Sequence, residues 1–188
     1  MALNAYLKLK GQIQGDIKGS VRQKGREGKI LVIAAEHQIV SPRDPASGLA
    51  TGRRQHMPFM VTKEIDASSP LLYSMLVKNE NITEFELQCW APQTKAGAGT
   101  GAEVQHYTVK LSNAALCEIR FEMPNNRDPA LVKLAGFEVL SFTYGKIQWL
   151  WTAGGITAED DWDTRPGAAP GKLPKAAKVA VKRPAKRA

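Results

Sequence analysis

Apolar and polar residues alternate with a period of two along much of this chain. Successive side chains of a strand point to opposite faces, so this period predicts strands with one face in a core. Seven segments carry strand signals, and residues 30–40 begin apolar on both faces. The segments are residues 5–10, 30–40, 57–65, 82–90, 104–111, 115–122 and 137–151.

The longest candidate strand, residues 137–151, is rich in β-branched and aromatic side chains. Both of its faces are apolar before Gly145, and after it Ile147, Trp149 and Trp151 alternate with polar residues. A strand of this length would extend about 50 Å at about 3.3 Å per residue, too far for one flat sheet in a small domain. We therefore expect a bend at Gly145.

The alternation also predicts which side chains face the core. In residues 5–10 we expect Tyr6 to point outward with the lysines. In the later strands we expect Cys89 and Cys117 to point inward, which favours buried, reduced thiols over a disulfide. The predicted inward residues are Ala5, Leu7, Leu9, Phe85, Leu87, Cys89, Tyr107, Val109, Leu111, Ala115, Cys117, Ile119 and Phe121.

One helix is expected where Ser69 and Pro70 follow a strand, with Ser69 as the N-cap and Pro70 at the first helical position. Its inner face would consist of Leu72, Met75, Leu76 and Asn79. The predicted fold is mainly β (α+β), a small antiparallel β-barrel or double sheet of about seven strands with one packed α-helix.

Residues 41–56 interrupt this pattern with two prolines and two glycines among small and polar residues. This composition predicts a long exposed loop. Loops of this length in compact domains are usually functional.

The charge is concentrated at the C-terminus. Residues 166–188 carry seven cations and no acid, so they account for 7 of the net +8 charges and leave the rest of the chain nearly neutral. We expect a folded domain over residues 1–163 and a disordered tail rich in Lys, Ala and Pro over residues 164–188. The tail cations are Lys172, Lys175, Lys178, Lys182, Arg183, Lys186 and Arg187.

Such a tail has two interpretations. It resembles the tails of linker histones, which neutralise phosphates without reading sequence, and would then bind nucleic acid or another polyanion. Alternatively it is a solubilising extension without a dedicated partner. The N-terminus has no signal-peptide pattern and no apolar run is long enough for a membrane span, so we expect neither a signal peptide nor membrane insertion.

Sites for chemistry are weakly indicated. None of His37, His56 and His106 has the spacing of a metal-binding pair, so we interpret them as ordinary strand and loop residues. The glycines near residue 99 precede a strand and not a helix, which argues against a phosphate loop. We therefore expect no catalytic site, no bound metal and no cofactor.

Two groups near residue 160 have more than one interpretation. Glu159, Asp160 and Asp161 are adjacent carboxylates that suit a hard cation, but a solvated segment that pairs with basic loops of the same or a neighbouring subunit explains them better. Trp149, Trp151 and Trp162 have the surface to stack on bases or sugars, but Trp149 and Trp151 at strand spacing are first core or interface residues.

Four motifs together resemble the haemolysin-coregulated proteins (Hcp), the inner-tube subunits of type VI secretion. The resemblance covers residues 1 to about 163 and excludes the tail. Its motifs are KGREGKI at residues 24–30, GRRQH at residues 52–56, TKEIDASSPLL at residues 62–72, and IQW at residues 147–149 with GGITAEDDW at residues 154–162.

The resemblance implies a β-barrel with one helix and no catalysis. It also implies hexameric rings that stack into a tube inside a contractile sheath, under a spike (VgrG-like) protein, with small effectors in the ring lumen. The protein would be cytoplasmic before assembly and then secreted without a signal peptide. The alternative function is nucleic-acid binding through the basic tail, with the barrel as a platform.

Two sets of contact residues follow as hypotheses. The loop of residues 41–56, which projects axially in the family, would stack one ring on the next through Arg43, Asp44, Arg53 and Arg54. The subunit interface within a ring would include Trp149, Glu159, Asp160, Asp161 and Trp162.

Overall fold

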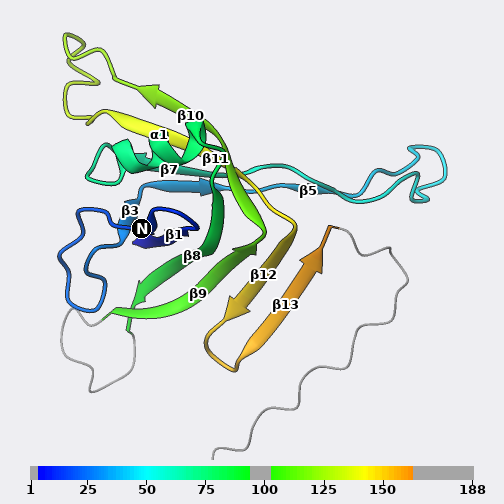
Figure 1. Ribbon diagram of the computed structural model, residues 1–188. Coiled ribbons are helices and arrows are strands. Elements are labelled where there is room, and N and C mark those ends of the chain that lie inside the picture. Colours follow the sequence, from blue (N-terminus) through cyan, green and yellow to red (C-terminus); the bar gives the residue numbers. More distant parts are fainter. Residues whose placement is uncertain (1–3, 94–102, 163–188) are drawn as a thin grey trace, which may run out of the picture.

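The computed structural model describes residues 4–93 and 103–162, which form a curled antiparallel sheet and one helix (Figure 1). The elements in chain order are β1 (Ala5–Gly11), β2 (Gly15–Ile17), β3 (Ile30–Val32), β4 (Ala34–Glu36), β5 (Ile39–Val40), β6 (Gln55–His56), β7 (Phe59–Glu64), α1 (Ser69–Val77), β8 (Asn81–Pro92), β9 (Glu103–Ser112), β10 (Ala114–Glu122), β11 (Phe137–Thr143), β12 (Lys146–Trp151) and β13 (Ile156–Asp161).

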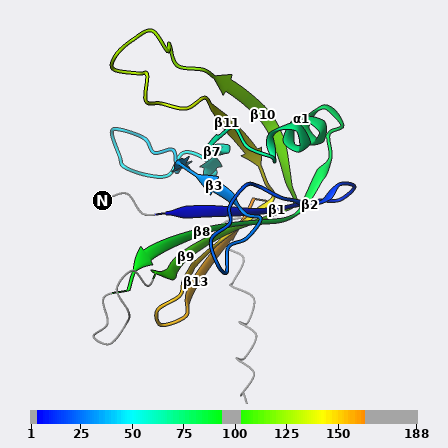
Figure 2. The same ribbon diagram turned by 90° about the vertical axis from the view of Figure 1, so that its left-hand side faces the viewer.

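The main sheet of the described residues has eleven strands in the order β13-β12-β9-β8-β10-β11-β7-β4, with β1, β2 and β3 attached through β8. Each described ladder is antiparallel. The long strand β8 pairs with β9 along most of its length but with β10 only at Asn81 and Ile82. The sheet therefore curls at the start of β8, which confirms the predicted mainly-β architecture (Figure 2).

The predicted bend at Gly145 is confirmed. It separates β11, which pairs with β10 and β7, from β12, which pairs with β9 and β13. The Gly145 amide donates to the carbonyl of Ser112 at 3.1 Å, and a Cβ at Gly145 would lie 3.3 Å from Asn113 Cβ. The bend thus takes the chain from one layer of the curled sheet to the other.

The core lies inside the curl and is closed at one end by α1, which packs against β10. Phe85 stands at its centre, with ring centroids 5.7 Å from Phe59 and 5.0 Å from Phe142. Leu72 and Met75 on the inner face of α1 are fully buried, as predicted. Complete burial of such side chains stabilises the fold by about 1.5–3 kcal/mol each.

Two details of the predicted helix were wrong. The N-cap is Ser68, because Ser69 has already entered the helix and its hydroxyl bonds the buried Glu138 carboxylate at 2.8 Å. Asn79 is exposed, since it adopts a positive φ of 48° just beyond the helix. That turn buries Glu80 instead, whose carboxylate accepts bonds from the backbone of the β1–β2 turn.

A buried ionic cluster forms from the TKEIDASSPLL segment. The Lys63 ammonium, with no exposed surface, lies 2.9 Å from Glu138, 3.1 Å from Asp66 and 2.9 Å from Ser69 Oγ. Burial acts to raise the pKa of Asp66, but bonds from Ser68 and Lys63 outweigh it and hold that pKa below its usual range. The cluster joins β7, β11 and the start of α1.

Two predicted strand faces also differ in the structure. Tyr6 lies on the face of β1 opposite Leu7, as predicted, but it is buried there, because the segment between β2 and β3 covers it and Arg26 lies over its ring. In β10 a register shift between Leu116 and Glu118 reverses the alternation. Leu116 before the shift is buried, and Cys117 at the shift is exposed rather than in the core. Beyond the shift, Ile119 packs against the core as predicted, but Phe121 is about half exposed.

The structure divides the chain more finely than the predicted seven strands. Residues 30–40 form three short strands, because β3 pairs with β1 whereas β4 pairs with β7. An additional strand, β13, follows a turn in which Gly154 and Gly155 have φ angles of 87° and 63°. Within the described ranges, no helix is both long and apolar enough for a transmembrane span.

Candidate functional site

The residues between β5 and β6 project from the barrel as an extended arm, which we call the projecting loop (residues 41–54; Figure 1). The loop is ordered by its own contacts. Arg43 donates to the carbonyl of Gly48 at 3.0 Å, and the Asp44 carboxylate accepts from Ser47 Oγ at 2.5 Å. The exposed loop predicted from the prolines and glycines is confirmed.

The base of the projecting loop is tied to the last strand. The Arg54 guanidinium forms an ion pair with Asp160 of β13 and donates to the carbonyl of Asp161 at 2.6 Å. His56 Nε2 lies 2.8 Å from the same Asp160 carboxylate. Arg54 was predicted for ring stacking and Asp160 for the subunit interface. In the structure the two bind each other within one chain.

Tyr144, the residue after β11, extends this network to the segment before β5. Its hydroxyl lies 2.8 Å from His56 Nδ1 and 2.6 Å from His37 Nε2. A carboxylate only accepts, so His56 Nε2–H donates to Asp160, and in this tautomer Nδ1 accepts from the Tyr144 hydroxyl. The Tyr144 oxygen then accepts from His37 Nε2–H. We call Arg54, His56, Tyr144, His37 and Asp160 the base network.

In the base network Tyr144 and His37 are held neutral, whereas Arg54 and Asp160 form a charged pair. Burial, with the charge of Asp160, raises the pKa of Tyr144 to about 12. Burial also lowers the pKa of His37, which favours its neutral ring. Burial acts to raise the pKa of Asp160, but bonds from Arg54 and His56 outweigh it and leave that pKa below its ordinary value.

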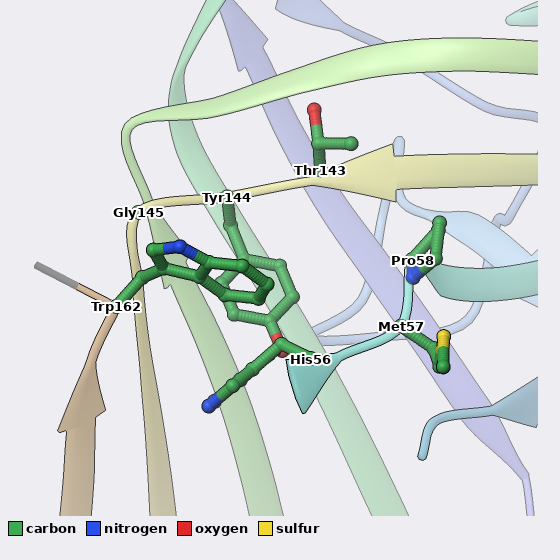
Figure 3. A pocket seen from close by; sticks show the side chains of 7 residues that line it. All are labelled: His56, Met57, Pro58, Thr143, Tyr144, Gly145 and Trp162. Atoms are coloured by element: carbon green, nitrogen blue, oxygen red, sulfur yellow. The ribbon is translucent and has the colours of Figure 1, made fainter. Parts of the chain in front are cut away.

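Trp162 covers the network from outside. Its indole meets the His56 ring edge-on, with centroids 5.2 Å apart, and the Trp162 amide donates to the carbonyl of Gly145 at 2.8 Å. Figure 3 shows Trp162 beside Tyr144 and His56, where they line a cavity of about 280 Å³ with Met57 and Pro58. Trp162 thus packs against its own chain with nearly half of its surface left exposed.

The remaining predicted contact residues are spread around this base. Arg53 is exposed on the projecting loop, next to Arg54. Glu159 pairs with Lys146 across the β12–β13 ladder at 3.0 Å. Trp149 is half-buried and packs against the core. The basic tail and the glycine-rich stretch near residue 99 lie outside the described residues, so polyanion binding stays a prediction.

The sequence interpretation missed the base network. His37 and His56 were treated as ordinary histidines, and Tyr144 as part of an apolar strand face. Their positions are separated by up to 107 residues, so no spacing rule could connect them. In the part of the chain that the structure describes, no group of three or more His, Cys, Asp or Glu side chains could hold a metal ion. The chemistry available here is hydrogen bonding and ion pairing, which suits the positioning of a loop.

Comparisons with known proteins agree on one family. The family described as "Type VI secretion system effector, Hcp" matches residues 6–151. The major exported protein of Pseudomonas aeruginosa is 35% identical over 171 residues, which cover 86% of this chain and 96% of that protein.

Solved structures are similar as well. A crystal structure of an Hcp protein has a TM-score of 0.76 at 29% identity, covering 87% of this chain and all of that one. The Hcp1 protein from the E. coli EAEC 042 pathovar has a TM-score of 0.73 at 34% identity, covering 86% of this chain and 99% of that one. On its sequence and its fold, this chain belongs to the Hcp family of type VI secretion system proteins.

Proposed function

We propose that this chain is a structural subunit of the type VI secretion tube, which forms hexameric rings that stack and are exported with small effectors in the lumen. The observation that carries the proposal is membership of the Hcp family over residues 6–151. The proposed role requires no catalysis. The proposed partners are further copies of the chain, the sheath and a spike (VgrG-like) protein, with assembly in the cytoplasm and then secretion.

The base network supports a mechanical role for the projecting loop. A loop that carries force between rings must keep its direction, and here its base is bonded to β13, to Tyr144 just after β11 and to the segment before β5. Buried, mutually satisfied polar networks of this kind rigidify the groups that they connect. The loop would therefore transmit contact forces to the barrel through three separate elements.

The free edge of β13 supports a contact between subunits. Among the described strands β13 is the last of its sheet, so one row of its backbone groups faces away from β12. Ile156 and Trp151, at the paired ends of these two strands, are both exposed apolar side chains. A heterologous contact of this edge with a different surface of the next copy would close into a ring. Glu159 and Trp162 belong to the same proposed interface.

The structure sharpens the test of stacking. Arg54 is committed to Asp160, so its replacement would disturb the loop base of each subunit before any contact between rings is made. Arg53 is exposed, and among the described residues no ion pair involves it. Arg53→Glu is therefore the informative change, and Arg54→Lys is a control that keeps the charge at the base.

We expect the full-length protein and Arg53→Glu both to form particles of six times the 20.5 kDa chain mass in light scattering. Negative-stain micrographs should show stacked rings for the first and single rings for the second. A protein that stays monomeric at high concentration would refute the ring proposal. Unchanged stacks of Arg53→Glu would refute the stacking role of this residue.

A further inference from the structure

The tip of the projecting loop presents one large apolar side chain in a fixed position. The Leu49 side chain is 69% exposed. The Leu49 carbonyl accepts from the Asp44 amide at 2.9 Å, and the Gly48 amide donates to the Asp44 carbonyl at 2.8 Å. A single exposed leucine is unremarkable on a protein surface. Because these bonds order the backbone at Leu49, only its own side chain remains to be ordered on binding, which favours a contact role.

A cavity of matching character lies at the far end of the barrel. It has a volume of about 300 Å³, and its apolar wall is formed by Tyr6, Val21, Leu31 and Ile65. Leu31 and Ile65, which both line the cavity, are 43% and 50% exposed. A side chain inserted into the cavity would cover them. The space is sufficient for one branched side chain, and we call it the β7-end cavity.

The charges at the two surfaces are complementary. Arg22 and Glu64 lie at the rim of the β7-end cavity, both exposed. Asp66 also lines the cavity, so its charged residues are two acids and one cation. The projecting loop carries the opposite excess, with Arg43, Arg53 and Arg54 against the single acid Asp44. No ion pair of the described residues includes Glu64 or Arg53, so each is available to a partner.

The β4–β7 ladder places the loop and the cavity at opposite ends of the molecule. Glu36, which leads to the loop, pairs with Met60 near the start of β7, whereas Ala34 pairs with Thr62 further along. β7 then ends at Glu64, on the rim of the cavity. In Figure 1 the loop extends to the right and the segment between β2 and β3 lies on the left, the side that Figure 2 turns toward the viewer.

We propose that Leu49 of one copy inserts into the β7-end cavity of the copy stacked against it, with Arg53 facing Glu64. The inference rests on the proposed stacking of rings and names the surface that receives the loop. Because tip and cavity differ and lie at opposite ends, the contact is heterologous and repeats without closing, as a tube requires. It would give all rings in a stack the same polarity.

Cross-linking tests this contact directly. In the full-length chain with Cys89→Ala and Cys117→Ser, we would add Leu49→Cys and Ile65→Cys and oxidise the protein. A disulfide needs Cα atoms within about 7 Å, so it reports insertion itself. We expect a ladder of trimers and longer species in denaturing, non-reducing gels. The matched control is Leu49→Cys with Val77→Cys, where Val77 at the end of α1 is 76% exposed and thus more accessible than Ile65 at 50%.

A ladder in the test pair and not in the control supports the insertion. Bands that stop at dimers would indicate a symmetric contact, and monomers alone would exclude this contact; either result overturns the proposal. Light scattering of the same samples under reducing conditions shows whether rings form without the disulfide. Rings without a ladder would overturn this contact and leave the tube subunit intact, whereas absence of rings would overturn the proposed function.

A charge exchange provides the second readout. Arg53→Glu should raise the concentration needed for stacked rings by well over tenfold, because two stacked rings make the contact six times and the loss of about 1.4 kcal/mol at a single pair already accounts for about tenfold. Adding Glu64→Arg to the same chain should restore stacking. Failure of the double variant to recover, when each single variant still forms rings, would overturn the pairing of Arg53 with Glu64.

Discussion

The base network makes a quantitative prediction for Asp160→Asn. The Asp160 carboxylate accepts from Arg54 and from His56, and charge-assisted bonds contribute about 1.5–3 kcal/mol each. Its side chain is 25% exposed, so solvent screening lowers that value, and asparagine keeps one acceptor oxygen. We expect a loss of about 1–2 kcal/mol in the free energy of unfolding. Glu159→Gln is the matched control, since its exposed pair with Lys146 contributes about 0.5 kcal/mol or less.

Urea unfolding would measure the global loss, and hydrogen exchange would locate it. The amide of Met57, bonded to the Gln38 carbonyl at 3.0 Å, should exchange about tenfold faster in Asp160→Asn, because it secures the loop base that this variant loosens. Amides in the β8–β9 ladder should be unaffected. Equal effects of Asp160→Asn and Glu159→Gln, or faster exchange throughout the sheet, would refute the idea that Asp160 specifically anchors the loop.

The pH dependence of this difference has a definite sign. The pKa of Asp160 is lower in the folded protein than its ordinary value of 3.8, so its ionised form stabilises the fold above that value. The stabilisation is lost as the pH falls through the lower, folded pKa. The wild-type protein and Asp160→Asn should therefore differ in stability at neutral pH and converge in acid.

Three further predictions follow from the core and the network. Lys63→Met should lower the unfolding free energy by about 3–5 kcal/mol because it leaves Glu138 buried without its counterion, and adding Glu138→Leu should recover most of this loss in urea unfolding. Gly11→Ala should cost about 1–3 kcal/mol, since its Cβ would overlap the Glu80 carboxylate; the control Gly52→Ala, whose Cβ would meet only Pro42 Cγ at 3.9 Å and whose φ is not positive, should cost much less in the same urea unfolding. The neutral Tyr144 phenol should stabilise the fold below pH 10.0 and lose that effect as the pH rises to about 12; an absorbance titration should show a late tyrosinate step that is missing in Tyr144→Phe.

Local patterns were sufficient for most of the strands and failed where a neighbouring segment decided the environment. The alternation around Leu7 and Leu9 predicted their burial correctly, because a strand with one dry face determines its own period. Tyr6 was assigned to the wet face, but Arg26, twenty residues away, covers it. Cys117 failed for a different reason, since it lies at the register shift in β10 between Leu116 and Glu118, which leaves no mark in composition.

At the candidate site, too, the sequence identified the segments but not the contact between them. The GRRQH and GGITAEDDW motifs were recognised separately, one as a ring-stacking loop and one as a subunit interface. In the fold they are adjacent, because the bend at Gly145 directs β12 and β13 back toward the loop base, where Arg54 meets Asp160. No periodicity encodes that meeting, since it depends on the topology of the whole sheet. It follows that the two surfaces are mechanically coupled, and a change at Asp160 should alter stacking through the loop even if it touches no neighbouring subunit.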